Sequence, residues 1–124
     1  MKVIAVVACL SLPIFAHAAE GSVEAGATVF KKCSACHSAD RPTNKVGPHL
    51  VSIVGRPVAA VVDYSKYSDA IKEEGAKGLK WDEATLATYL AAPKMMIPKT
   101  RMAFTGLKKE QDVADVIAYL KALK

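Results

Sequence analysis

Two cysteines and a histidine in the first third of the chain stand at a spacing that suits a specific chemistry. Cys33, Cys36 and His37 form the pattern C-x-x-C-H. Thiols three residues apart lie on one side of a helical turn, where both can bond to the vinyl groups of a haem while the adjacent imidazole reaches the iron. A redox dithiol or half of a zinc site would explain the two cysteines but not the histidine directly after them. The pattern therefore predicts one covalently attached haem c.

The second axial ligand of such an iron decides whether the site carries electrons or offers an open position to a substrate or a gas. Met102 is the best-placed candidate, because a proline and a glycine bracket an extended stretch around it. Two other methionines closely follow the end of a predicted helix, and we interpret them as core filling. The neutral side chains that remain open as ligands are His49, Met95, Met96 and Met102.

Helical periodicity appears in four stretches, each of which begins or ends at a recognisable signal. Ser22 and Asp82 are typical N-caps, Gly75 is expected to stop the second helix, and Pro93 must end the third near Ala92. The stretches between them lack periodicity and contain proline and glycine, and none is a convincing strand. We predict helices over 22–36, 68–74, 82–92 and 109–123, with irregular segments over 38–67 and 94–106.

Apolar residues within these stretches define the faces that should be buried. In the first helix the expected inner stripe is Val23, Ala27 and Phe30, and Gly26 marks a close helix crossing. In the later helices the expected core residues are Leu86, Tyr89, Leu90, Val113, Val116, Ile117, Leu120 and Leu123.

The first eighteen residues have the features of a cleaved secretory signal peptide. Lys2 is followed by an apolar run to Phe15, and A-x-A at residues 16–18 is a typical cleavage site. A retained membrane anchor or a lipoprotein signal ending at Cys9 fits less well, since the apolar run is short for either. We predict a signal peptide over 1–18, one domain over 19–124 and a periplasmic location, with two cysteines left for haem.

The chain contains 17 basic and 12 acidic residues, a formal net charge of +5. This balance favours acidic protein partners and does not by itself indicate nucleic acid. Several basic residues flank the two candidate ligand segments, including Lys31 and Lys45, so they can surround an exposed haem edge. As partner-docking residues we predict Lys32, Lys94, Arg101, Lys108 and Lys109.

Beyond the five-residue motif, the chain resembles class I cytochrome c, the small soluble type that includes mitochondrial cytochrome c and bacterial periplasmic carriers. The resemblance covers nearly all of residues 19–124, and its residues follow the order of that family. It implies an all-α fold of three to five helices and long loops wrapped around one covalently bound haem. The residues that carry it beyond the motif are Gly26, Phe30, Gly47-Pro48, Gly55-Arg56, Trp81, Tyr89, Pro93-Lys94, Ile97-Pro98, Thr100, 102–106 and 117–120.

By this resemblance, Met102 is the distal iron ligand opposite His37, whose far ring nitrogen donates a hydrogen bond to the carbonyl of Pro48. The first and last helices should cross where Gly26 and Phe30 meet Tyr119 and Leu120. The remaining residues that the resemblance places at the haem are Arg56, Tyr67 and Trp81 at a buried propionate, and Tyr89 and Thr100 beside Met102.

The same resemblance implies a one-electron carrier that is a monomer and not an enzyme. A quinol-oxidising membrane complex would donate the electron, and a terminal oxidase, a photosynthetic reaction centre or another reductase would accept it. Two alternatives stay open. If Met102 dissociates easily, the iron would act as a peroxidase or a gas binder, and a stable partner would make the chain a dedicated subunit of one enzyme.

Overall fold

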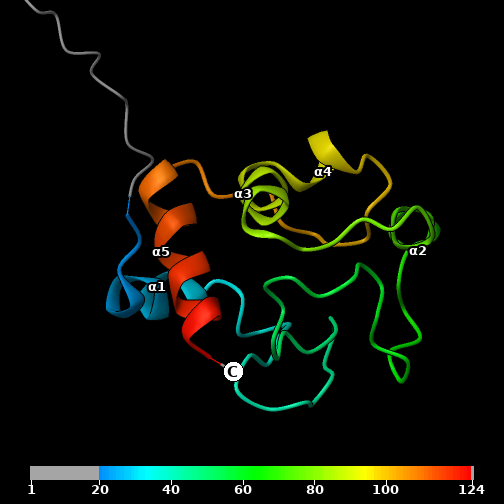
Figure 1. Ribbon diagram of the computed structural model, residues 1–124, viewed down its shortest axis with the longest axis horizontal. Coiled ribbons are helices and arrows are strands. Elements are labelled where there is room, and N and C mark those ends of the chain that lie inside the picture. Colours follow the sequence, from blue (N-terminus) through cyan, green and yellow to red (C-terminus); the bar gives the residue numbers. More distant parts are fainter. Residues whose placement is uncertain (1–19, 124) are drawn as a thin grey trace, which may run out of the picture.

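The computed structural model describes residues 20–123, so the predicted signal peptide lies outside the described residues. Long connections join most of the helices, whereas only Ala92 separates α3 from α4 (Figure 1). Within residues 20–123 there is no β-strand, only an isolated antiparallel bridge between Pro57 and Lys80. In that range no helix is long and apolar enough to cross a membrane. The helices are α1 (Val23–Phe30), α2 (Asp69–Ala76), α3 (Glu83–Ala91), α4 (Pro93–Met96) and α5 (Glu110–Ala122).

Three helices begin at residues whose side chains cap them. The side-chain oxygens of Ser22, Ser68 and Asp82 each accept a hydrogen bond from the backbone N–H three residues further on, at 2.8–3.2 Å. Each bond satisfies one of the backbone donors that a helix N-terminus leaves unpaired. These caps confirm the predicted starts of the first three helices.

Four predicted details of the helices are wrong. α1 ends at Phe30, and consecutive turns rather than regular helix continue to residue 36. α2 continues through Gly75 to Ala76, because the residue that takes the left-handed conformation, with φ +87°, is Gly78. The segment after Pro93 is not wholly irregular, since it starts with the single turn of α4. α1 also buries Gly26, Val29 and Phe30, and leaves Val23 and Ala27 exposed.

The crossing of α1 with α5 is the most extensive helix–helix contact in the described chain. A Cβ at Gly26 would collide with the backbone oxygen of Asp115 and with the side chain of Tyr119, so only glycine allows this approach. The Phe30 and Tyr119 rings pack with their centroids 5.4 Å apart. The buried Asp115 carboxylate accepts a hydrogen bond of 2.8 Å from the backbone N–H of Ser22. The predicted crossing of the first and last helices is thus confirmed.

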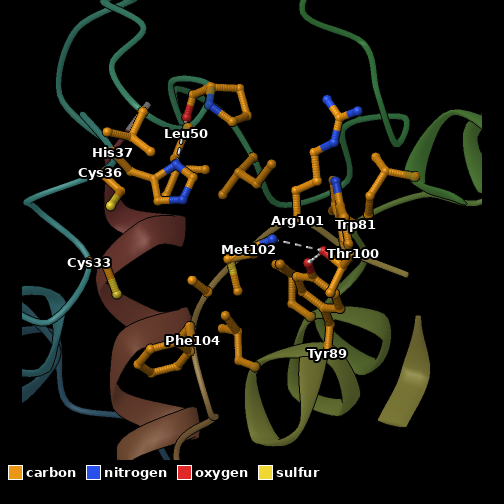
Figure 2. Close-up of a pocket in the computed structure, with 18 of the residues that line it drawn as sticks. Cys33, Cys36, His37, Leu50, Trp81, Tyr89, Thr100, Arg101, Met102 and Phe104 are labelled. Atoms are coloured by element: carbon orange, nitrogen blue, oxygen red, sulfur yellow. Dashed lines mark hydrogen bonds between the residues drawn. The ribbon is translucent and has the colours of Figure 1, made fainter. Parts of the chain in front are cut away.

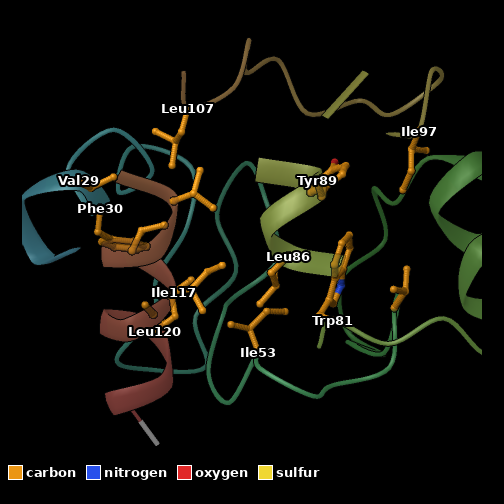
Figure 3. Close-up of a cluster of buried hydrophobic side chains, with 14 of the residues drawn as sticks. Val29, Phe30, Ile53, Trp81, Leu86, Tyr89, Ile97, Leu107, Ile117 and Leu120 are labelled. Carbon is orange, nitrogen blue, oxygen red and sulfur yellow. The ribbon is translucent and has the colours of Figure 1, made fainter. Parts of the chain in front are cut away.

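The buried apolar side chains form one cluster that spans the helices and the loops (Figure 3). Phe30, Ile117 and Leu120 gather on the side of α1 and α5, and Leu86 and Trp81 gather on the side of α3. The predicted core residues of α3 and α5 belong to this cluster, either buried or packed against it. Between these two groups of side chains lies the cavity that forms the candidate functional site.

Candidate functional site

A cavity of about 470 Å³ lies between α1, α3, α5 and the loops that connect them. Its walls are mainly apolar, and its size is typical of a pocket for an organic ligand. Cys33, Cys36, His37 and Met102 all line it. Figure 2 shows the His37 ring and the Met102 side chain reaching this space from different segments of the chain. The structure therefore brings together the two cysteines predicted to attach a haem and the two side chains predicted to bind its iron.

The two cysteines lie on the turns that follow α1. The backbone N–H of Cys33 bonds to Phe30, and those of Cys36 and His37 both bond to the carbonyl of Cys33, at 3.1 and 3.0 Å. Both cysteines carry free thiols. Burial, together with the nearby Cys36, raises the pKa of the Cys33 thiol above its ordinary value. These turns keep both thiols and the imidazole at one wall of the cavity.

The His37 imidazole is fixed by the two residues that the loop places against it. Its Nδ1 lies 2.7 Å from the carbonyl oxygen of Pro48, which can only accept, so Nδ1 carries the proton and Nε2 is free to bind a metal. A Cβ at Gly47 would collide with the ring, so glycine lets the backbone approach it closely. Burial lowers the pKa of His37, although the bond to Pro48 opposes the shift. The expected hydrogen bond to Pro48 is therefore present, and burial favours the neutral imidazole that metals require.

Met102 is held from α3 through two hydroxyl groups. The Tyr89 hydroxyl and the Thr100 hydroxyl are 2.7 Å apart, and Thr100 Oγ1 accepts a hydrogen bond of 3.3 Å from the backbone N–H of Met102. Both Tyr89 and Thr100 are buried, and burial raises the pKa of Tyr89, so its hydroxyl stays protonated at neutral pH. Buried hydroxyl groups that are paired in this way fix the local backbone. Tyr89 and Thr100 thus hold the segment that carries Met102.

The other candidate ligands are elsewhere. Met96 is half-buried against the apolar cluster, which agrees with core filling, whereas Met95 is 84 % exposed, so core filling is wrong for that residue. The Nδ1 atom of His49 lies 3.3 Å from the backbone N–H of Val51. His49, Met95 and Met96 are not among the residues that line the cavity.

One part of the cavity wall is polar and centres on Arg56. Its Nη1 donates to the carbonyl of Val51 at 3.2 Å, while its buried Nε has no hydrogen-bond partner within residues 20–123. Burial lowers the pKa of this guanidinium, and neighbouring Tyr67 opposes the shift. Tyr67 and Trp81 line the cavity beside it. A buried cation with a spare donor suits an anionic group such as a haem propionate, and the apolar walls suit the porphyrin ring.

The predicted docking residues are all exposed, and four of them border two different hollows. Lys32 and Arg101 line the main cavity. Lys94 and Lys108 line a second cleft of about 400 Å³ next to Phe104. Phe104 lines both hollows, so these four residues lie around connected parts of one surface. Lys109 lines neither hollow and precedes α5.

Sequence reasoning missed part of the cavity wall. Leu50 and Ile53 line the cavity from a loop that has no periodic pattern, so nothing in the sequence separates them from ordinary core residues. It also missed Tyr64, which lines the cavity and donates a hydrogen bond of 2.5 Å to the carbonyl of Val46. Such a bond joins two loops and leaves no signal in local sequence.

Comparison with known proteins shows which protein family this chain resembles. The family model described as cytochrome c matches residues 23–124. A cytochrome c2 from Agrobacterium tumefaciens is 44 % identical over 102 residues, which is 82 % of this chain and 91 % of that protein. A cytochrome c homolog from Rickettsia prowazekii is 48 % identical over 97 residues, and these span 77 % of this chain but about half, 53 %, of the longer relative.

A solved structure gives the same result for the fold. Cytochrome cH from Methylobacterium extorquens superposes with a TM-score of 0.73 at 41 % sequence identity, and the match covers 82 % of this chain and 99 % of that one. The all-α architecture described above, helices and long loops around one cavity, is therefore the architecture that was expected from the sequence.

Proposed function

Since this chain belongs to the cytochrome c family, whose members transport electrons on one covalently attached haem c, we propose that it is a one-electron carrier with His37 and Met102 as the two axial ligands of the iron. The supporting observation is that both side chains line the cavity that also contains the Cys33 and Cys36 thiols. A haem c bound there supplies an iron that is reversibly oxidised and reduced by one electron.

The chain's own residues have distinct tasks in this proposal. Cys33 and Cys36 would form the two thioether bonds, and Pro48 orients His37 by accepting a hydrogen bond from its Nδ1–H. Arg56 offers its unpaired Nε–H to a propionate, next to Tyr67 and Trp81. Tyr89 and Thr100 keep the backbone of Met102 in place.

Two protein ligands on opposite sides of the iron leave no position for a substrate, so we propose a carrier and not an enzyme. A thioether is a softer and less basic ligand than a second imidazole, which favours the ferrous state and raises the reduction potential. The apolar walls of the cavity act in the same direction, because they disfavour the additional positive charge of ferric iron. The carrier would therefore work near the oxidising end of an electron-transport chain.

The partners we propose are redox complexes with acidic docking surfaces. Lys32, Lys94, Arg101, Lys108 and Lys109 steer such a partner toward the haem edge, and exposed charges allow rapid release as salt screens them. A quinol-oxidising complex as donor and a terminal oxidase or reaction centre as acceptor fit this role. We propose that residues 1–18 act as a signal peptide, so that the carrier works in the periplasm. We also propose that it is a monomer.

The experiment that tests the proposal is the near-infrared absorption of the ferric protein, where a thioether bound to iron gives a weak sulfur-to-iron charge-transfer band. We expect the band in the wild type and in Met96→Ala, the matched control, because Met96 packs against the core and does not line the cavity. We expect it to disappear in Met102→Ala. A band that survives in Met102→Ala, or is missing in the wild type, contradicts His37/Met102 ligation.

A further inference from the structure

The segment 61–67 connects two loops that border the cavity on different sides. On one side, the Tyr64 hydroxyl donates to the carbonyl of Val46, and Asn44 donates to Asp63 at 3.1 Å. On the other side, Arg101 donates a hydrogen bond of 3.4 Å to the carbonyl of Lys66. Arg101 directly precedes Met102. The segment is therefore tied both to the loop beside His37 and to the loop that carries Met102.

The orientation of Tyr64 is fixed by its surroundings. Its ring packs edge-to-face on Tyr67, with centroids 4.8 Å apart and an interplanar angle of 79°. The Tyr67 hydroxyl accepts a hydrogen bond of 3.2 Å from the backbone N–H of Val61, which folds the segment back on itself. Burial raises the pKa of Tyr64, so its hydroxyl is a donor across the neutral range. The contact with Tyr67 thus orients the ring so that its hydroxyl reaches Val46.

Val46 directly precedes the two residues that determine the position of His37. Gly47 allows the imidazole to approach the backbone, and the Pro48 carbonyl accepts a hydrogen bond of 2.7 Å from Nδ1–H. The Val46 side chain lines the cavity and is 68 % exposed, so contacts with other protein side chains do little to hold this residue. Its backbone position depends instead on hydrogen bonds. The neighbouring Gly47 N–H donates to the carbonyl of Cys36 at 2.8 Å, and within residues 20–123 the bond from Tyr64 is the one made by Val46 itself.

We propose that Tyr64 is a positioning residue for the histidine ligand. By holding Val46, Tyr64 sets the strength of the hydrogen bond between His37 and Pro48, and this bond in turn sets the reduction potential of the haem. A stronger bond to Pro48 makes the imidazole a more basic ligand, and a more basic ligand favours ferric iron and lowers the potential. This inference rests on the proposed function, because it requires His37 to bind the iron.

The test uses Tyr64→Phe in the haem-containing protein, since this change keeps the ring and removes only the hydroxyl. We expect the midpoint potential to rise. We also expect the His37 ring N–H to exchange with solvent about tenfold faster in the ferrous protein, as measured by NMR, because loss of one hydrogen bond is worth about 1.4 kcal/mol of local stability.

Two control variants separate positioning from general loosening of the loop. Val62→Ala changes a side chain of the same segment that is 99 % exposed, and Asp63→Ala removes the bond from Asn44 without touching Val46. Both should leave the potential and the ring N–H exchange as in the wild type. If Asp63→Ala shifts both as far as Tyr64→Phe does, the effect is general and the proposal is wrong.

The proposal is also wrong if Tyr64→Phe lowers the resistance to denaturant but changes neither the potential nor the exchange, since Tyr64 is then only a structural brace. A fall in potential with unchanged exchange contradicts it as well. Failure of the proposed function would look different, because the wild-type protein itself would lack the sulfur-to-iron band. That band stays in the wild type and in Tyr64→Phe if only the present inference fails.

Discussion

The crossing of α1 and α5 and the loop-built half of the cavity are stabilised in different ways. At the crossing, two helices meet directly at Gly26, with buried apolar side chains and a buried carboxylate between them. The loops 38–67 and 97–107 contain no helix or strand, and they combine buried side chains such as Ile53 and Leu107 with single hydrogen bonds such as Tyr64–Val46. We infer that the crossing is stabilised mainly by its own packing, whereas the loops, which line much of the cavity, depend more on what fills it.

The largest expected effect is that of removing the haem. Without haem, the side chains around a mainly apolar cavity of about 470 Å³ would lose the group they pack against, and loss of buried apolar packing on this scale is large against the marginal stability of a small domain. We therefore expect the chain without haem to lose hydrogen-exchange protection in both loops, while residual helical structure is confined to α1 and α5. NMR with hydrogen exchange measures this. Equal protection of loops and crossing in the haem-free chain would contradict the comparison.

The next largest effect should come from Gly26→Ala, which alters only the crossing. The added Cβ would collide with the backbone of Asp115, and overpacking of this kind costs about 1–3 kcal/mol. We expect a lower free energy of unfolding by chemical denaturation, with the sulfur-to-iron band unchanged. Ala27→Ser, one residue further on the exposed face, is the matched control and should change stability by less than about 0.5 kcal/mol. A disturbed band in Gly26→Ala would mean that the two regions are not independent.

A smaller and more local effect is expected of Thr100→Val in the loop half. The valine leaves the Tyr89 hydroxyl and the Met102 N–H without their partner, at a cost of about 1–2 kcal/mol. Met102 should then dissociate more easily, so added imidazole should bind the ferric iron about tenfold more tightly, as measured by titration of the visible spectrum. Thr105→Val, an exposed change in the same loop, should bind imidazole like the wild type. Equal affinities for all three proteins would refute the role of Thr100.

The smallest expected effect is that of changing Asp82, the N-cap of α3. Its hydrogen bond from the backbone N–H of Thr85 lowers its pKa below the ordinary value of about 3.9. A lowered folded-state pKa means that the carboxylate stabilises the fold above about pH 4, and that this contribution is lost as the pH falls through the folded value. Urea midpoints of the wild type should therefore fall slightly more on acidification than those of Asp82→Asn, which keeps an uncharged cap. Identical pH profiles would show that the charge contributes nothing.

The sequence predicted what depends on short-range patterns. The caps at Ser22 and Asp82, the start of a helix at Ser68 and the core face of α5 follow from residue types at fixed offsets, and the fold class follows from them and from the family resemblance. The end of α1 was not predictable, because the residues after Phe30 are compatible with helix and it is the tertiary structure that turns the chain there.

For the candidate site, how well the sequence predicted a contact depended on the kind of contact. The hydrogen bond from His37 to Pro48 was expected from the resemblance, and Met102 lines the same cavity. The close approach of Gly47 to the His37 ring was not expected. The exposure of Met95 and the bond between Tyr64 and Val46 were not expected, since both depend on how loops far apart in sequence are placed. Single contacts between loops leave no repeating pattern in the sequence, so they cannot be predicted from it.

The crossing of α1 and α5 also has a consequence for the order of events during biosynthesis. Its two halves come from opposite ends of the domain, and the hydrogen bond from Ser22 to Asp115 joins residues 93 positions apart. This contact cannot form until α5 has been synthesised, because long-range pairing has to await both partners. The two cysteines directly follow α1, so they remain on an unpaired, accessible chain during that interval. The covalent attachment of haem thus has a window before the domain closes around it.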